Sequence, residues 1–249
     1  KDERTVYGTW QADEIRRQAT AETTAAVEGA RQAGADEILV HDIGFIRGAS
    51  PIGLVLHYDD LPRGIHIALG GAPIHQVVDS SFDAAILLGH HAMAGVEKGV
   101  MAHTFSSLTI ENIWLNGRRI GEIAIEALWL GAFGIPVVMV SADEDGCREA
   151  RDWLGDVETA PTKRGLGTHR AISLHPADAC DLILARAAAA LARLDDFAPF
   201  APPPPYELQF DCYTEEQAQT RCAKLDGRAE IIGPRSFLLR GEKPLDLVW

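Results

Sequence analysis

Three short runs of almost uninterrupted apolar residues alternate with helical segments along the chain. They read DEILVHD (36–42), SFDAAILLG (81–89) and IPVVMVSAD (135–143), and such runs are typical of strands buried on both faces. One helical pattern covers 11–34 and ends at a glycine, and a second covers 121–134. This alternation predicts an α/β fold with a mostly parallel central sheet and flanking helices. In such folds the functional residues lie at the carboxyl ends of the strands.

Other patterns surround these runs. The dipeptide Asn116-Gly117 separates two stretches of alternating apolar and polar residues, which is the strongest short signal for a β-hairpin. Residues 159–175 form a polar stretch. An alanine-rich helix then begins at Pro176 and runs to about Leu194, because proline is favoured in the first turn of a helix.

Four consecutive prolines at 202–205 mark a break in the chain. Such a run cannot continue a helix and favours an extended linker. We therefore expect an α/β catalytic domain over residues 1–198 and a smaller, proline-linked α+β segment over residues 199–249.

Composition narrows the range of partners. The 249 residues include 23 basic and 36 acidic side chains, a formal net charge of −13, which disfavours nucleic acid and anionic membranes because both are polyanions. The four cysteines are scattered without a CxxC spacing, so neither a disulfide framework nor a structural zinc knot is expected. No apolar run reaches the roughly 18 residues of a membrane helix, and no secretory signal opens the chain. A cytoplasmic location is the expectation.

Histidines follow two of the predicted strands. His90 and His91 come directly after the second buried run, and His103 follows twelve residues beyond His91 across a glycine-containing loop. His41 and Asp42 end the first run. Imidazole and carboxylate groups are ligands for zinc, which in catalytic sites keeps one position open for water. Adjacent residues of a strand point in opposite directions, so we expect only one of His90 and His91 to be functional. A structural role for these histidines is the alternative.

Charged side chains give weaker signals. Glu122 and Glu126 are four residues apart and therefore share one face of a helix. Glu122 is a candidate metal ligand or simply an acid stabilised at a helix start. Lys163 and Arg164 lie beside glycines and could bind an anionic group of a substrate. We expect residues 143–145, Asp-Glu-Asp, to form a solvated helix start. The sequence contains no GxSxG, GxxxxGK[ST], HExxH or GxGxxG pattern in its required context.

A series of motifs resembles one known family. In order along the chain these are TAETTAAVEGARQAGADEILVHD (20–42), LLGHHAMAG (87–95), GVMAHTFSS (99–107), WLNGRRIGEIAIEALWLGAFGIPVVMVSADE (114–144) and TKRGLGTHRAISLHP (162–176). The chain thereby resembles the M55 family of metallopeptidases, the D-aminopeptidases of the dipeptide-transport operon type. The resemblance covers roughly residues 10 to 240 and is most specific from 84 to 144.

The resemblance implies roles for individual residues. The family's GYHA pattern places its metal-ligand histidine on His91 and leaves His90 in a variable place. We assign His90 and Lys163 to substrate binding. The GVMSHS pattern places its histidine on His103, the expected catalytic acid/base. The GELG pattern places its glutamate on Glu122, the expected carboxylate ligand.

Two departures from the family pattern concern the remaining ligands. The family's first strand carries an Asp-x-Glu pair, and in this chain that strand would precede residue 1. The histidine of the family's NDSH pattern falls on Gly44. His41 or Asp42, two or three residues earlier, could replace it.

The resemblance implies one or two Zn²⁺ or other divalent ions and a short-peptide or small-molecule substrate. It also implies a homo-oligomer, a pentameric ring or a decamer of stacked rings. We expect a metal-dependent hydrolase that releases N-terminal D-amino acids from short peptides. Two alternatives stay open: a divergent member, with an altered metal site, that hydrolyses a different small amide, lactam or lactone, and a non-catalytic ring-forming scaffold.

Overall fold

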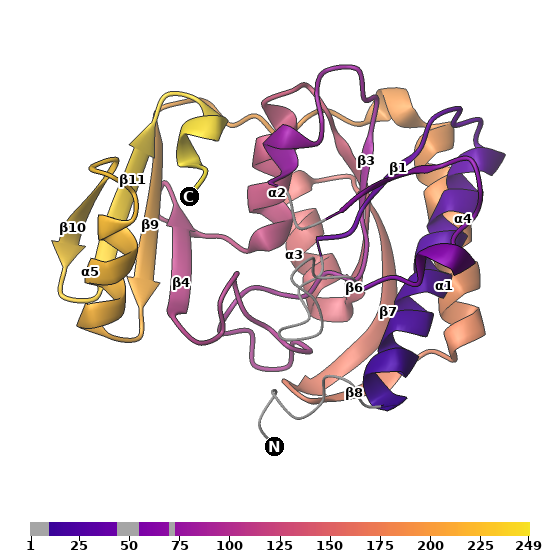
Figure 1. The fold of residues 1–249 in the computed structure, drawn as a ribbon, viewed down its shortest axis with the longest axis horizontal. Coiled ribbons are helices and arrows are strands. Elements are labelled where there is room, and N and C mark those ends of the chain that lie inside the picture. Colours follow the sequence, from indigo (N-terminus) through magenta and orange to yellow (C-terminus); the bar gives the residue numbers. More distant parts are fainter. Residues whose placement is uncertain (1–9, 44–54, 70–72) are drawn as a thin grey trace. The chain divides into compact units, whose positions relative to one another are not determined.

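The structure is a computed structural model and describes residues 10–43, 55–69 and 73–249 (Figure 1). Its helices and strands, in chain order, are α1 (Trp10–Gln32), β1 (Leu39–His41), β2 (His66–Ala68), β3 (Ala85–Leu87), β4 (Ile110–Leu115), β5 (Arg118–Arg119), α2 (Glu122–Gly131), β6 (Val137–Asp143), α3 (Glu144–Leu154), β7 (Glu158–Gly167), β8 (Arg170–Ser173), α4 (Pro176–Ala192), β9 (Tyr206–Cys212), α5 (Glu215–Ala223), β10 (Ala229–Gly233) and β11 (Ser236–Gly241). The chain divides into two compact units, residues 1–79 with 174–194 and residues 80–173 with 195–249.

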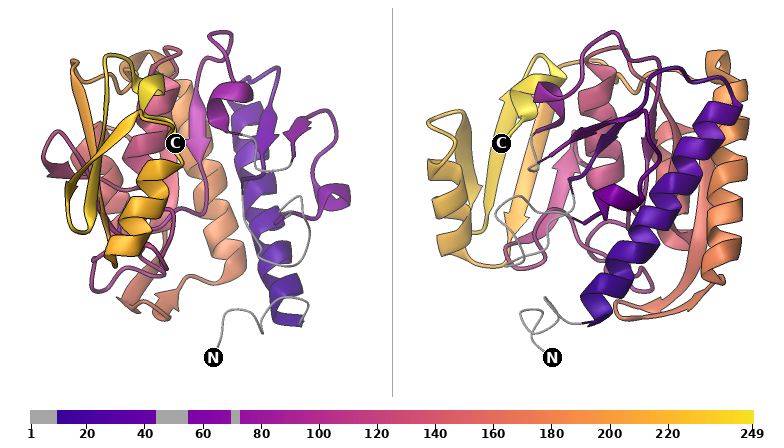
Figure 2. Two further views of the ribbon diagram at one scale, coloured as in Figure 1. Left: turned by 60° about the vertical axis from the view of Figure 1, so that its left-hand side comes forward. Right: turned by 45° about the vertical axis from the view of Figure 1, so that its right-hand side comes forward.

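The first unit is built on the α1–α4 helix pair, which lies side by side in both views of Figure 2. Gly29 permits the close approach, because a Cβ there would lie 2.4 Å from the Leu184 carbonyl oxygen and 2.9 Å from the Ala187 Cβ. Strands β1 and β2 pair in parallel in the same unit. Among the described residues, no helix combines the length and the apolar character needed to cross a membrane. The expected cytoplasmic location stays a prediction.

The second unit holds a four-stranded sheet in the order β3-β6-β7-β8. β3, β6 and β7 are parallel, and β8 joins antiparallel to β7. Every residue of β6 is buried, as its uninterrupted apolar run predicts, and α3 packs against β6 and β7. The α/β class with flanking helices is confirmed, and this sheet is the mostly parallel one.

The same unit contains a five-stranded antiparallel sheet in the order β10-β11-β9-β4-β5. The hairpin predicted at Asn116-Gly117 is confirmed as β4–β5, with positive φ at both turn residues, 49° and 77°. Strand β9, which follows the prolines, pairs directly with β4. The segment after residue 198 thus completes a sheet that the hairpin begins. A domain boundary at that residue stays a prediction.

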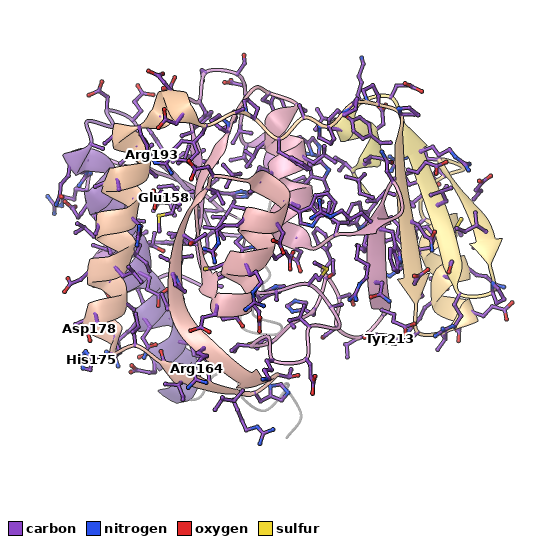
Figure 3. The ribbon with its side chains drawn as sticks, turned by 180° about the vertical axis from the view of Figure 1, so that it is seen from behind. Glu158, Arg164, His175, Asp178, Arg193 and Tyr213 are labelled. Atoms are coloured by element: carbon purple, nitrogen blue, oxygen red, sulfur yellow. The ribbon has the colours of Figure 1, made fainter. Side chains whose placement is uncertain are left out.

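Strands β7 and β8 occupy the stretch that the sequence shows only as polar. β7 lies between β6 and β8, and its buried positions are Ala160, Thr162 and Gly165. The side chains between these positions face outward and include Pro161 and Arg164, which is labelled in Figure 3. Tertiary pairing with β6 supplies the strand conformation here, overriding the low strand propensity of proline, glycine and charged residues.

The main core of the second unit lies between α2 and the antiparallel sheet. Ile120, Ile125 and Leu128 of the α2 region pack with Phe210 and Phe237 of β9 and β11. The two phenylalanine rings are stacked with centroids 4.6 Å apart and are 0–1% exposed. Because α2 is buried almost throughout, its first residue is held rigidly in place.

We predict that Phe210→Ala lowers the free energy of unfolding by about 3–5 kcal/mol, because the substitution leaves a cavity in a close-packed core. Urea unfolding followed by circular dichroism measures this change. Tyr213→Ala is the matched control: Tyr213 follows β9 and is 45% exposed, so its loss should change stability by no more than about 0.5 kcal/mol. Equal effects of the two substitutions would contradict the assigned core.

Candidate metal centre

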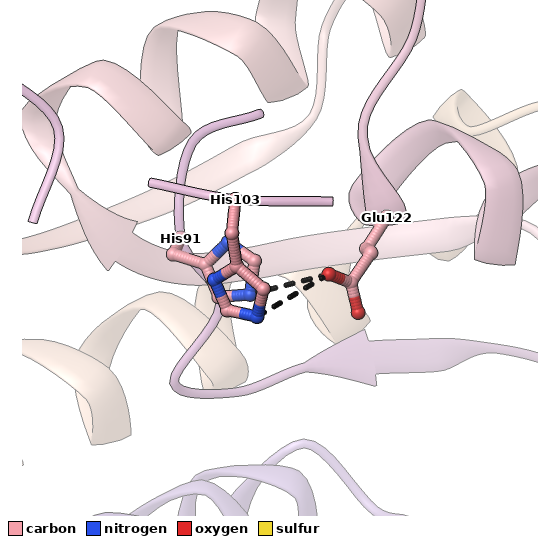
Figure 4. A group of neighbouring side chains, drawn as sticks. All are labelled: His91, His103 and Glu122. Carbon is pink, nitrogen blue, oxygen red and sulfur yellow. Dashed lines mark ion pairs between the residues drawn. The ribbon is translucent and has the colours of Figure 1, made fainter. Parts of the chain in front are cut away.

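Three side chains, two from one loop and one from the start of a helix, converge in the second unit (Figure 4). His91 follows β3, His103 lies further along the same loop, and Glu122 is the first residue of α2. The Nε2 atoms of His91 and His103 lie 3.4 Å and 3.8 Å from the same oxygen, Glu122 Oε1. One ligand atom from each residue lies within 4.8 Å of the other two. Two imidazole nitrogens and one carboxylate oxygen form a donor set suited to zinc.

Backbone carbonyls orient both imidazole rings. His91 Nδ1 lies 3.1 Å from the Ala92 carbonyl oxygen, and His103 Nδ1 lies 2.6 Å from that of Met101. A carbonyl only accepts hydrogen bonds, so each Nδ1 carries a proton and donates it. In the neutral ring the Nε2 lone pair is then free and faces Glu122. This tautomer is the one that metal-ligating histidines adopt when they bind through Nε2.

The electrostatics of the cluster favour a cation among its three members. Burial lowers the pKa of His91 to about 4, and the neighbouring His103 adds to this effect, so His91 is neutral near pH 7. The two rings stack with centroids 3.9 Å apart. The Nε2 lone pair of His91 therefore faces the Glu122 carboxyl oxygen with no imidazole proton between them. A bound divalent ion would turn this mutual repulsion into attraction.

Glu122 is held at the start of α2. Its Oε1 accepts a hydrogen bond of 2.6 Å from the Phe105 backbone N–H, two residues after His103, and its side chain is 16% exposed. Burial raises the pKa of its carboxyl group, although the Phe105 hydrogen bond opposes that shift. The first turn of a helix and a bound cation would both favour the carboxylate form.

His90 points to a different partner. Its Nε2 lies 3.3 Å from Glu126 Oε2, and both side chains are less than 10% exposed. Burial alone would lower the pKa of His90, but attraction to Glu126 and their hydrogen bond outweigh it, so this pKa is raised. Only His91 of the adjacent pair joins Glu122 and His103. The substrate-binding role of His90 stays a prediction.

Two other candidate ligands belong to the first unit. Asp42 is 5% exposed, and its Oδ2 accepts hydrogen bonds from the backbone N–H groups of Val55 and Leu56 and from the hydroxyl of Tyr58, at 2.9–3.1 Å. Burial and this hydrogen bond raise the pKa of Tyr58. The expected metal-binding roles of His41 and Asp42 stay predictions. Gly44, where the family's histidine would fall, lies outside the described residues.

The basic residues at 163 and 164 lie on β7. Lys163 is half-buried, and its Nζ donates to Thr162 Oγ1 at 3.1 Å. Arg164 is exposed. The predicted substrate contact of Lys163 stays a prediction.

Two buried acids at the β6–α3 corner were missed by the sequence reading. Asp143 and Glu149 are 3% and 4% exposed. The expected solvated helix start at 143–145 is therefore wrong for Asp143, whereas Glu144 is exposed. Asp143 caps α3 through the Gly146 N–H and also accepts from the Val100 N–H at 2.6 Å. Burial raises the pKa of Glu149 to about 7. The helix start at 143 was visible in the sequence, but the inward direction of these side chains was not.

The chain is similar to known D-aminopeptidases in sequence and in fold. The family model of M55 peptidases, described as D-aminopeptidase, matches residues 1–247. A D-aminopeptidase of Bacillus subtilis (strain 168) is 28% identical over 202 residues, which span 80% of this chain and 71% of that protein. A solved structure described as the Zn-dependent D-aminopeptidase DppA from Bacillus subtilis, a self-compartmentalizing protease, superposes with a TM-score of 0.86 at 25% identity. The match covers 99% of this chain and 88% of that chain.

The raised pKa of Glu149 predicts a pH dependence of stability in the metal-free protein. Between about pH 4.5 and 7 the unfolded chain has released this proton while the folded chain keeps it, so stability falls as the pH rises through this window and levels off above pH 7. Glu149→Gln removes that loss. We expect the variant to gain up to about 3 kcal/mol over the wild type between pH 4.5 and 8. Parallel curves from urea unfolding would contradict the assignment.

Proposed function

Because the chain belongs to the M55 family of D-aminopeptidases, we propose that it is a metal-dependent hydrolase that releases N-terminal D-amino acids from short peptides. The observation that carries the proposal is the convergence of His91, His103 and Glu122 with their acceptor atoms facing one another. Burying such a group of polar atoms costs folding free energy unless a bound cation pairs with them. The Zn-dependence of the Bacillus subtilis relative supports zinc as that cation.

In this proposal His91 and Glu122 hold the ion and His103 moves a proton. A bound zinc ion would supply Lewis acidity and lower the pKa of a coordinated water toward neutrality. His91 is fixed through Ala92, and Glu122 is fixed through Phe105. His103 has the most exposed side chain of the three, at 25%, and its Nδ1 contact with Met101 leaves Nε2 to take up and release a proton at a substrate nitrogen. Further ligands from outside this cluster would complete a one- or two-ion site.

Self-assembly is part of the same proposal. The related structure is described as a self-compartmentalizing protease, and a ring enclosing its active sites admits short peptides while excluding folded proteins. We propose a homo-oligomer, either a pentameric ring or a decamer.

The assembly is tested by light scattering coupled to size-exclusion chromatography. We expect a mass five or ten times that of the 27.0 kDa chain. A monomeric mass at micromolar concentration would contradict the ring.

Metal content tests the site. We expect purified wild-type protein to contain one or two zinc ions per chain by elemental analysis, and His91→Ala and Glu122→Ala to lose bound zinc. Both variants should also lose hydrolysis of D-aminoacyl dipeptides. His169→Ala is the control, because His169 is exposed on the β7–β8 turn. A wild type that binds no divalent ion would overturn the proposed function.

Comparing zinc content with kcat distinguishes a proton-transfer role of His103 from a metal-binding role. We expect His103→Gln to retain at least half of the zinc while kcat falls by about 10²- to 10⁴-fold, since general acid–base catalysis contributes that much. Steady-state kinetics on a D-alanyl dipeptide, run beside metal analysis, gives both values. If the variant loses zinc in step with activity, His103 is a ligand and the proton-transfer assignment is wrong.

A further inference from the structure

The loop that carries His91 and His103 is hydrogen-bonded to side chains at the β6–α3 corner. It runs from Gly89 to Thr104 and has no helix or strand of its own. The backbone N–H of Met93 donates to Glu149 Oε2 at 2.7 Å, and that of Val100 donates to Asp143 Oδ2 at 2.6 Å. Glu149 therefore anchors the part of the loop that follows His91, and Asp143 anchors the part that precedes His103.

Glu149 also lies against the helix that carries Glu122. A Cβ built on Gly121 would lie 2.1 Å from Glu149 Oε1 and 2.8 Å from the Met93 Cβ. Gly121 has φ of −110° and ψ of −176°, an extended conformation that any residue adopts, so close packing accounts for the glycine. The Glu149 carboxyl group thus fills the space between the loop after His91 and the residue before Glu122.

The Met93 side chain of the loop borders an open pocket. A cavity of about 170 Å³ adjoins Glu149 and is lined in part by Met93, Val96 and Trp153. The Met93 side chain is half-buried. The Glu149 hydrogen bond, together with those that Ala94 makes with Thr104 and Arg119, keeps Met93, and with it His91, in register with α2.

We propose that Glu149 is a positioning residue that sets the distance between His91 and Glu122 and so raises the affinity of this cluster for a divalent ion. The inference rests on the proposed function for the metal itself. Glu149 touches neither His91 nor Glu122 directly. It acts through the Met93 N–H on one side and the Gly121 backbone on the other.

The required feature of Glu149 is its acceptor oxygen. Burial raises the pKa of its carboxyl group to about 7, so near pH 7 much of it is uncharged, and glutamine presents the same carbonyl acceptor in the same shape. Leucine has a similar volume but cannot accept the Met93 N–H. Hydrogen bonds made directly to metal ligands are worth about 10- to 100-fold in metal affinity when lost, and we expect a comparable loss for this bond, which acts through the backbone of Met93.

The test compares wild type, Glu149→Gln and Glu149→Leu as full-length protein. The zinc dissociation constant is measured at pH 7 by competition with a chromophoric chelator, and thermal unfolding is followed in parallel. We expect Glu149→Leu to raise the dissociation constant about 10- to 100-fold and Glu149→Gln to stay within about 3-fold of the wild type. Asp211→Leu is the matched control. Asp211 is a part-buried acid on β9 that bonds Trp114 and Ser236, so its loss should lower the unfolding temperature without changing zinc affinity.

A second variant covers the case in which Glu149→Leu does not fold. Gly121→Ala keeps Glu149 but inserts a methyl group where its carboxyl oxygen lies, and we expect it also to weaken zinc binding about 10-fold or more. Unchanged zinc affinity in the folded Leu or Ala variant would overturn the positioning role, as would a Gln variant as weak as Leu.

Failure of the proposed function gives a different result. In that case the wild type itself binds no zinc. Amide hydrogen exchange of the metal-free protein then decides whether Glu149 orders the loop. Faster exchange at residues 92–94 in Glu149→Leu than in Glu149→Gln supports that role, and equal exchange in the two variants overturns it.

Discussion

The meeting of two imidazole lone pairs with one carboxylate oxygen is the interaction on which the rest of this site depends. Since each Nδ1 lies against a backbone carbonyl, the Nε2 atoms of both rings are the ones that face Glu122. Burial makes that arrangement costlier, because it removes the water that would otherwise solvate these atoms. A protein retains such an arrangement where a ligand compensates it, and a divalent cation has the required charge and size.

The buried helix α2 and hydrogen bonds to the histidine loop keep the cluster in place. Glu122 begins a helix that is buried almost throughout, so its position follows the core of the antiparallel sheet. The histidine loop has no regular structure, and buried side chains therefore take over the role that a strand's neighbours would play. Asp143, Glu149 and Thr104 each accept a hydrogen bond from a loop N–H. Preorganisation of this kind keeps the donor atoms close before any ion binds, which lowers the ordering cost of binding.

The sequence reveals those features that depend on local pattern. The apolar run of β6, the Asn116-Gly117 turn and the helix beginning at Glu122 each carry their signal within a few residues, and each forms as expected. The sequence does not predict β7, because Pro161, Gly165 and its charged residues have low strand propensity and adopt the strand conformation only when paired with β6. The convergence of His91 with Glu122, 31 positions apart in the sequence, follows from family resemblance rather than from spacing. The burial of Glu149 could not be predicted, because a glutamate within a helical segment gives no local signal that its carboxyl group faces inward.

The units of the chain divide the candidate ligands into two groups. His91, His103 and Glu122 all belong to residues 80–173, within one compact unit, so their mutual geometry is set by the contacts of that unit alone. His41 and Asp42 belong to the other, and Asp42 already accepts three hydrogen bonds there. An acid so engaged must give up or share these bonds to bind a metal, which lowers its net gain from coordination. Among the described residues, the Nε2 atoms of His91 and His103 face the Glu122 carboxyl group, and we expect metal affinity to arise first from this cluster.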